Sequence, residues 1–214
     1  MLDSGTFVVF VPAALALILA PGPDTFYVLT RALGHGRAVG VAAAAGISAG
    51  VVVHTVAAAL GLSVLLRESA LAFRVVKYLG AVYLLYLGVE ALRSPERFEF
   101  SGGDGSPGGD ATGSRASFAR GVLVNALNPK VALFFLAFLP QFVTATGSTV
   151  QFLTLGGTYS ALTLCYLAAV ASFAGTVRRV LTGRPSVERA LRRATGAVFV
   201  GLAVQLAVEE RFGV

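Results

Sequence analysis

Two short segments place opposite charges inside stretches apolar enough to cross a bilayer: 21–24 (Pro-Gly-Pro-Asp) and 125–130 (Asn-Ala-Leu-Asn-Pro-Lys). Asp24 and Lys130 each follow a proline directly. A charge at the bilayer centre costs about 2.5–3.5 kcal/mol on insertion scales, so we expect both residues to be paired or functional. Two interpretations are compatible. One is a salt bridge that clamps two halves of the chain; the other is a zwitterion site, in which Lys130 and exposed helix-start N–H groups hold a carboxylate while Asp24 and freed carbonyls hold an ammonium group.

The prolines in these segments predict helices that are interrupted within the membrane. A proline removes a backbone donor and clashes with the preceding turn, and lipid cannot satisfy the carbonyls that are freed. Asn125 and Asn128 both donate and accept, which suits either the orphaned backbone groups or direct contact with a substrate. Matched breaks in two halves of a chain are typical of a transporter's binding site. The residues expected to shape the breaks through their backbone are Pro21, Gly22, Pro23 and Pro129.

His54 is the third ionisable residue predicted to lie at depth. It is either a neutral histidine bonded to a neighbouring helix or a proton carrier for a coupled antiporter. The nearby segment 46–50 fits the G-x-S-x-G pattern of hydrolases, but that pattern requires a strand before the turn and here it lies in an alanine-rich helical run. Ser48 and His54 would point about 120° apart on a helix. Gly46 and Gly50 are better explained as a small-residue packing face.

Composition predicts a polytopic membrane protein. The 214 residues are 56% hydrophobic and 13% charged, whereas a soluble domain carries roughly a quarter charged residues. The net charge of +6 does not indicate nucleic-acid binding, because the basic residues lie between apolar spans and fit topology signals and lipid headgroup contacts. Two histidines and one cysteine, Cys165, form no recognisable metal set, and no phosphate-binding loop is present. We therefore expect no metal, no cofactor and no enzyme.

The apolar runs predict an all-α fold of six transmembrane helices. Their expected ranges are 5–30 (broken at 21–24), 38–66, 71–92, 116–142 (broken at 128–130), 150–177 and 191–209. The glycine-rich polar stretch 101–114 is typical of a flexible linker. The predicted domains are a first three-helix repeat (1–95), a linker (96–115) and a second three-helix repeat (116–214).

The basic residues predict how the helices cross the membrane. One set of connections carries twelve arginines, namely Arg31, Arg37, Arg93, Arg97, Arg115, Arg120, Arg178, Arg179, Arg184, Arg189, Arg192 and Arg193. The opposite set carries Arg67, Arg74, Lys77 and Arg211. Because positive loops stay in the cytoplasm, we expect both termini outside. Three helices per half then make the two repeats inverted, and a pseudo-two-fold axis would bring the two breaks together.

Several segments together resemble the LysE/RhtB family of amino-acid exporters. They are 19–24 (Leu-Ala-Pro-Gly-Pro-Asp), 31–37, 46–50 with His54, 77–88, 125–130 and 138–142 (Phe-Leu-Pro-Gln-Phe). The resemblance implies export of amino acids across a prokaryotic inner membrane, driven by the proton gradient. The positions that match the family motifs residue for residue are Asp24, Asn128, Pro129 and Lys130.

The substrate class follows from the charges at depth. Apart from Asp24, we find no acid there that would favour a cationic amino acid. Among the substrates that the resemblance implies, we therefore expect a neutral one such as threonine, homoserine or leucine. An exporter of cationic amino acids and a non-transporting membrane scaffold are the alternatives. Expected partners are the amino acid, protons and membrane lipid, and the small-residue faces would permit a homodimer.

Overall fold

The computed structural model describes residues 4–62, 70–93, 110–143, 148–183 and 185–208, and every element within them is helical. The elements are α1 (Ser4–Leu19), α2 (Pro23–His35), α3 (Arg37–Ala57), η1 (Ala58–Leu62), α5 (Ala70–Arg93), α6 (Asp110–Ala126), α7 (Pro129–Leu133), η2 (Phe134–Phe138), η3 (Leu139–Phe142), α8 (Ser148–Ser172), α9 (Ala174–Gly183) and α10 (Pro185–Val208).

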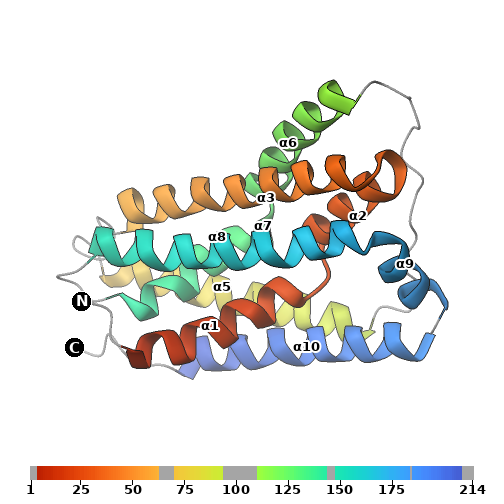
Figure 1. Ribbon diagram of the computed structural model, residues 1–214. Helices are drawn as coiled ribbons and strands as arrows, with labels where there is room; N and C mark the ends of the chain where they lie inside the picture. Colours follow the sequence, from red (N-terminus) through yellow and green to blue (C-terminus); the bar gives the residue numbers. More distant parts are fainter. Residues whose placement is uncertain (1–3, 63–69, 94–109, 144–147, 184, 209–214) are drawn as a thin grey trace.

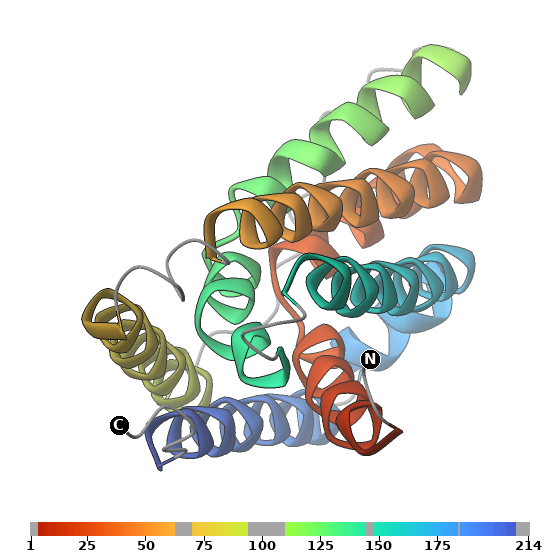
Figure 2. The ribbon, with the colours of Figure 1, turned by 90° about the vertical axis from the view of Figure 1, so that its left-hand side faces the viewer.

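The helices form an elongated bundle around the segment α7–η2–η3 (Figure 1). Seen along the bundle, this segment lies in the middle and α1, α3, α5, α8 and α10 surround it (Figure 2). α3 runs antiparallel to α8 and packs against it, and α5 does the same with α10. α1 begins and α10 ends at the same end of the molecule (Figure 1).

Four helices of the described chain are each long and apolar enough to cross a membrane, and two bent pairs would raise the number to six. The four are Arg37–Gly61, Arg74–Arg93, Thr149–Ser172 and Arg189–Val208. The pairs are Gly5–Leu19 with Pro23–His35, bent by 54°, and Gly113–Ala126 with Pro129–Phe142, bent by 49°. Both bends fall at the segments whose prolines predict broken helices.

Three helix boundaries differ from those expected. α8 ends at Ser172, and the amphipathic α9 turns toward the start of α10, where the sequence predicts one helix to 177 (Figure 1). α10 begins at Pro185, six residues earlier than expected, because proline is well suited to the first turn of a helix. α6 begins at Asp110, so residues 110–115 of the expected linker are helical, while 96–109 lie outside the described residues.

A close crossing between α3 and α6 depends on glycine. A Cβ at Gly46 would collide with the backbone carbonyl of Phe118, and one at Gly50 would lie 2.7 Å from Cβ of Asn125. On the other helix, a Cβ at Gly121 would lie 2.6 Å from the carbonyl oxygen of Ala43. The prediction that Gly46 and Gly50 form a packing face is confirmed. This face, which the sequence offers for a homodimer, packs within the chain.

Candidate functional site

The first break leaves the carboxyl end of α1 open, and Lys130 caps it. α1 ends at Leu19 because Pro21 and Pro23 restrict the residues before them to extended backbone. The last carbonyls of a helix lack intrahelical partners and carry the negative end of its dipole. The Lys130 ammonium donates to the carbonyl oxygens of Leu17 at 3.2 Å and Ala20 at 3.0 Å. Lys130, 9% exposed, therefore links the second half of the chain to the first.

The second break is capped by its own asparagine. Asn128 precedes Pro129 and has extended backbone, with φ −77° and ψ 108°. Its Oδ1 accepts from the backbone N–H of Lys130 at 3.0 Å, which makes it the N-cap of α7. Asn128 is 3% exposed, and its Nδ2 has no hydrogen-bond partner among the described residues. A buried amide donor is thus left over at the break.

A second set of hydrogen bonds, made by Asp24, Asn125 and His54, also joins the two breaks. Asn125 Nδ2 donates to Asp24 Oδ2 at 2.9 Å, linking α6 to α2. His54 Nε2 donates to the backbone carbonyl of Asn125 at 2.9 Å, which adds α3. Within the described chain, Asp24 Oδ1 and Asn125 Oδ1 are buried without a partner. Asp24 also lies in the first turn of α2, where the helix dipole stabilises a negative charge.

Asp24 and Lys130 do not form the direct ion pair that the sequence suggests as a clamp. In the described part of the chain, the carboxylate is bonded to Asn125 and the ammonium to two carbonyls of the first break. Each charge nevertheless connects one half of the chain to the other. The freed carbonyls that the zwitterion interpretation assigns to a substrate ammonium are occupied by Lys130.

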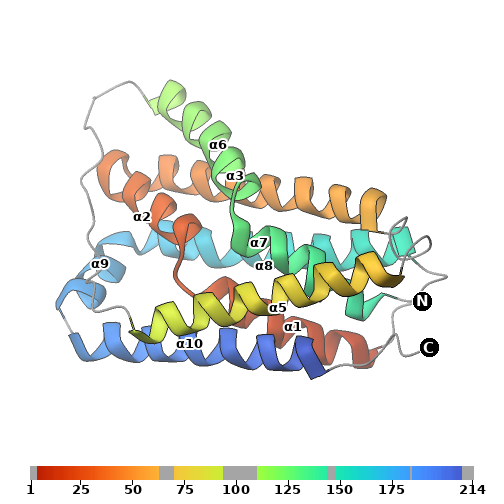
Figure 3. The same cartoon turned by 180° about the vertical axis from the view of Figure 1, so that it is seen from behind.

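A cavity of about 320 Å³ lies between the two breaks and the helices α5 and α10. Figure 3 shows the backbone of these helices from behind. The first break contributes Pro21, Gly22 and Pro23, and the second contributes Asn128, Pro129 and Lys130. The remaining wall residues are Tyr83, Leu87, Glu90 and Ala91 of α5 and Arg192, Thr195 and Phe199 of α10. Of the residues predicted from the sequence to touch substrate, Asn128 and Lys130 line the cavity, whereas Asp24 and Asn125 are not among its described lining.

Sequence reasoning missed the wall supplied by α5 and α10. Arg192 was expected to be a topology signal, and Glu90 was not among the acids expected at depth. The available signal was the spacing of Tyr83, Leu87, Glu90 and Ala91, which puts them on one face of a helix. The packing of α5 against α10, η2 and α7 turns that face toward the breaks.

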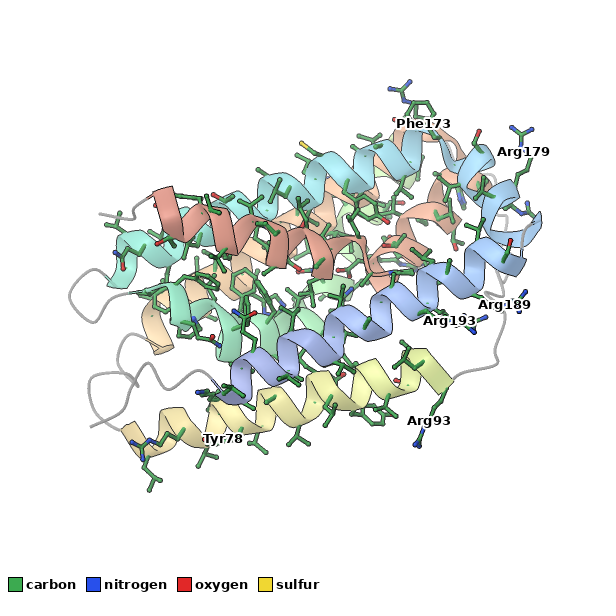
Figure 4. All side chains as sticks on the ribbon, turned by 90° about the horizontal axis from the view of Figure 1, so that it is seen from below. Tyr78, Arg93, Phe173, Arg179, Arg189 and Arg193 are labelled. Atoms are coloured by element: carbon green, nitrogen blue, oxygen red, sulfur yellow. The ribbon has the colours of Figure 1, made fainter. Side chains whose placement is uncertain are left out.

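The cavity lies in the half of the molecule where arginines gather. Its α5 residues fall within the last eleven residues before Arg93, and Arg192 is near the start of α10. Arg93, Arg179, Arg189 and Arg193 all lie at this end (Figure 4).

On the other side of the breaks, aromatic rings that are buried or partly buried fill the bundle. We call Phe10, Phe134, Phe135, Phe138, Phe142 and Tyr159 the aromatic cluster. Its rings pack at centroid separations such as 5.1 Å for Phe134 with Phe138 and 5.4 Å for Phe10 with Phe142.

Comparison with known proteins agrees with these features. Residues 15–210 match the family model described as LysE type translocator. The chain belongs to this family. It is 32% identical over 203 residues to a leucine efflux protein of Klebsiella pneumoniae, with 94% of each chain covered, and equally to one of Enterobacter sp. strain 638. A leucine efflux protein of Salmonella typhimurium is 31% identical over 204 residues, covering 92% of each chain. No solved structure matches the chain.

Membership of the LysE type translocator family confirms the resemblance carried by the two break motifs. This LysE-type chain is accordingly a transporter and not an enzyme, and a multi-pass membrane protein of a bacterial exporter family.

Proposed function

We propose that this protein exports a neutral amino acid, leucine in the first place, across the bacterial inner membrane. The observation that carries the proposal is the cavity at which both helix breaks meet, with Lys130 and Asn128 in its wall. Its volume of about 320 Å³ is at the small end of the range for ligand sites. Relatives of nearly the same length that are leucine efflux proteins support the substrate.

Two donors in the wall suit the substrate carboxylate. An ammonium group has three N–H donors, and the two carbonyls of Leu17 and Ala20 use two of those of Lys130. The third is left for a ligand. Asn128 Nδ2, buried and without a partner in the described chain, is the second donor. The amino-acid side chain would lie against the apolar residues Leu87 and Phe199.

The charges of the wall favour a neutral over a cationic amino acid. Lys130 is a buried cation in the described wall. A zwitterion supplies a carboxylate for it, whereas lysine or arginine would also bring a second cation beside it.

Uptake of radiolabelled leucine into proteoliposomes loaded with unlabelled leucine tests this function. Lys130→Ala removes a charge-assisted donor, and we expect it to lower counterflow by about 10- to 100-fold. Because Lys130 also caps α1, its removal disturbs folding as well. Gly22→Ala is the sharper variant, since the new Cβ would lie 3.1 Å from Lys130 Nζ while the φ of −159° suits any residue.

We expect Gly22→Ala to raise the KM for leucine several-fold without lowering the Tm. Gly157→Ala is the matched control, because a Cβ at Gly157 meets no atom of the described residues within 4 Å. Wild-type protein that gives no counterflow with any neutral amino acid would contradict the proposed function. Wild-type counterflow with unchanged kinetics in both Lys130→Ala and Gly22→Ala would contradict only the site.

We further propose that export is coupled to proton entry through the chain of Asp24, Asn125 and His54. The two titratable groups are linked through Asn125, whose side chain donates to Asp24 and whose carbonyl accepts from His54. Asp24 Oδ1, which has no partner among the described residues, is an acceptor for an incoming proton. In this proposal Asp24 and Asn125 serve coupling, next to the cavity wall that holds the substrate.

The proposed transport cycle is alternating access between two inverted repeats. Each half of the chain has one bent pair followed by two long helices, and the antiparallel pairs α3–α8 and α5–α10 support an axis that relates the halves. In this proposal each bent pair counts as one transmembrane span, and the protein has six spans in all. The arginine-rich end would face the cytoplasm and both termini the outside.

A further inference from the structure

The cavity contains a carboxylate that the break motifs do not supply. Glu90 is the acid among its described lining residues, and it projects from the same face of α5 as Leu87 and Tyr83. Asp24, the acid of the first break, is held by Asn125 and is not part of the described wall. An amino acid bound at Lys130 therefore meets a different acid from the one that the sequence motif predicts.

The relative heights of Glu90 and Lys130 follow from the packing of α5 against η2. A Cβ at Gly80 would collide with the Cβ of Ala137, so these two residues lie at one level. α5 runs antiparallel to the segment α7–η2 (Figure 3). Lys130 precedes Ala137 by seven residues and so lies level with Leu87. Glu90 is three residues further along α5, about 4.5 Å nearer the arginine-rich end at about 1.5 Å per residue.

This spacing suits the ammonium and carboxylate groups of an α-amino acid, which are both bonded to the α-carbon. We propose that Glu90 binds the ammonium group of the substrate while Lys130 and Asn128 bind its carboxylate. Glu90 thereby makes the site selective for free amino acids over simple carboxylates. The inference rests on the proposed function and specifies the orientation of the substrate: ammonium toward the arginine-rich end, carboxylate at the breaks, side chain against Leu87 and Phe199.

Binding of two matched ligands to purified protein tests this role. Leucine and 4-methylpentanoate differ in the amine alone, so an acid that binds the amine must distinguish them. We expect wild-type protein to bind leucine more tightly than 4-methylpentanoate, and Glu90→Gln to weaken leucine binding by about tenfold. Affinity for 4-methylpentanoate should not change in Glu90→Gln, and Glu90→Asp should be intermediate for leucine.

Two controls separate this effect from general damage. Glu90 is exposed, so Glu90→Gln should keep the wild-type Tm. Arg93→Gln changes a charge on the same helix outside the described wall, and we expect it to leave the ratio of the two affinities unaltered. If wild-type protein does not bind leucine, the proposed function fails. If it does and Glu90→Gln binds both ligands as wild type does, only the role of Glu90 is refuted.

Discussion

At the scale of single residues, Lys130 combines a structural and a chemical role. Its ammonium satisfies two carbonyls that Pro21 and Pro23 leave open at the end of α1, and the same group lines the cavity. A charge buried in this way is stabilised by the backbone of the opposite half of the chain, with no carboxylate within salt-bridge distance in the described residues. Any movement that separates the two halves of the chain must break these bonds. The capping of α1 by Lys130 therefore depends on whether the cavity is open or closed.

The proposed role of Asp24, Asn125 and His54 in proton coupling leads to a prediction about two kinds of transport. Exchange of leucine for leucine needs no net proton movement, whereas accumulation driven by a pH gradient does. We expect Asp24→Asn and His54→Gln to retain exchange but to lose gradient-driven accumulation, down to the level of protein-free liposomes. Asn at position 24 can still accept from Asn125 Nδ2, so the link between α2 and α6 is kept.

Thr154→Val is the control for this experiment. Its exposed hydroxyl donates to the carbonyl oxygen of Val150 within α8, so the substitution removes a polar group outside the three linked residues. Both transport modes should stay near wild type in this variant. Gradient-driven accumulation that persists in both Asp24→Asn and His54→Gln would remove these residues from coupling.

Residue types that act locally were predictable from the sequence. The N-cap role of Asn128 follows from its place just before Pro129, and the bond from His54 to a neighbouring helix was one of the two interpretations of that residue. Glu90 and Arg192 were not recognised as cavity residues. They come from α5 and α10, and their meeting depends on the packing register of helices about a hundred residues apart in the chain.

At the scale of elements, the breaks were predictable and the end of α8 was not. Proline chemistry is local, so the bends of 54° and 49° fall where Pro21, Pro23 and Pro129 stand. The apolar run 150–177 contains no proline, so nothing of that kind indicates the turn at Phe173. The helix nevertheless turns there, and α9 packs against the start of α10. Such a turn is decided by tertiary contacts that the sequence pattern does not contain.

The crossing of α3 and α6 gives a prediction about stability. In Gly46→Ala, the new methyl group would collide with the backbone carbonyl of Phe118, which cannot rotate away, so the two helices must separate. Such overpacking typically costs about 1–3 kcal/mol. We expect the Tm of the purified protein to fall by several degrees in Gly46→Ala.

Replacement of glycine by alanine at a position without close neighbours among the described residues should have the opposite effect on the Tm. Gly157 lies within α8, and no described residue comes near its Cβ position. Alanine is favoured over glycine inside a helix by roughly 0.5–1 kcal/mol. Gly157→Ala should therefore hold or raise the Tm. Equal Tm values for Gly46→Ala and Gly157→Ala would show that the close crossing is not needed for stability.

At the scale of the whole molecule, the cavity and the aromatic cluster lie on opposite sides of the breaks. The cavity is on the side of Arg93 and Arg189, and the rings of Phe10, Phe138 and Phe142 fill the bundle on the other. With the arginine-rich end in the cytoplasm, as we propose, this arrangement is the one in which an exporter loads its substrate. The aromatic cluster must then repack before release.

This orientation predicts which end of the protein meets the outside. Cys165 is the sole cysteine of the chain, so Cys165→Ser provides a background without thiols. Exposed Thr149, at the start of α8, and exposed Arg179, on α9, lie at opposite ends of the molecule. In intact cells, a membrane-impermeant maleimide should label Thr149→Cys but not Arg179→Cys, because basic segments stay in the cytoplasm.

Labelling of the cavity itself tests from which side the substrate is loaded. Thr195 lines the cavity on α10, so in inside-out vesicles a small thiol reagent should reach Thr195→Cys, and leucine should slow the reaction by occupying the site. Arg179→Cys, remote from the cavity wall, should react there at a rate that leucine does not change. Labelling of Arg179→Cys in intact cells would show that the protein has the opposite orientation in the membrane. If leucine protects Thr195→Cys only when it is added from the side of the aromatic cluster, the substrate is loaded from that side.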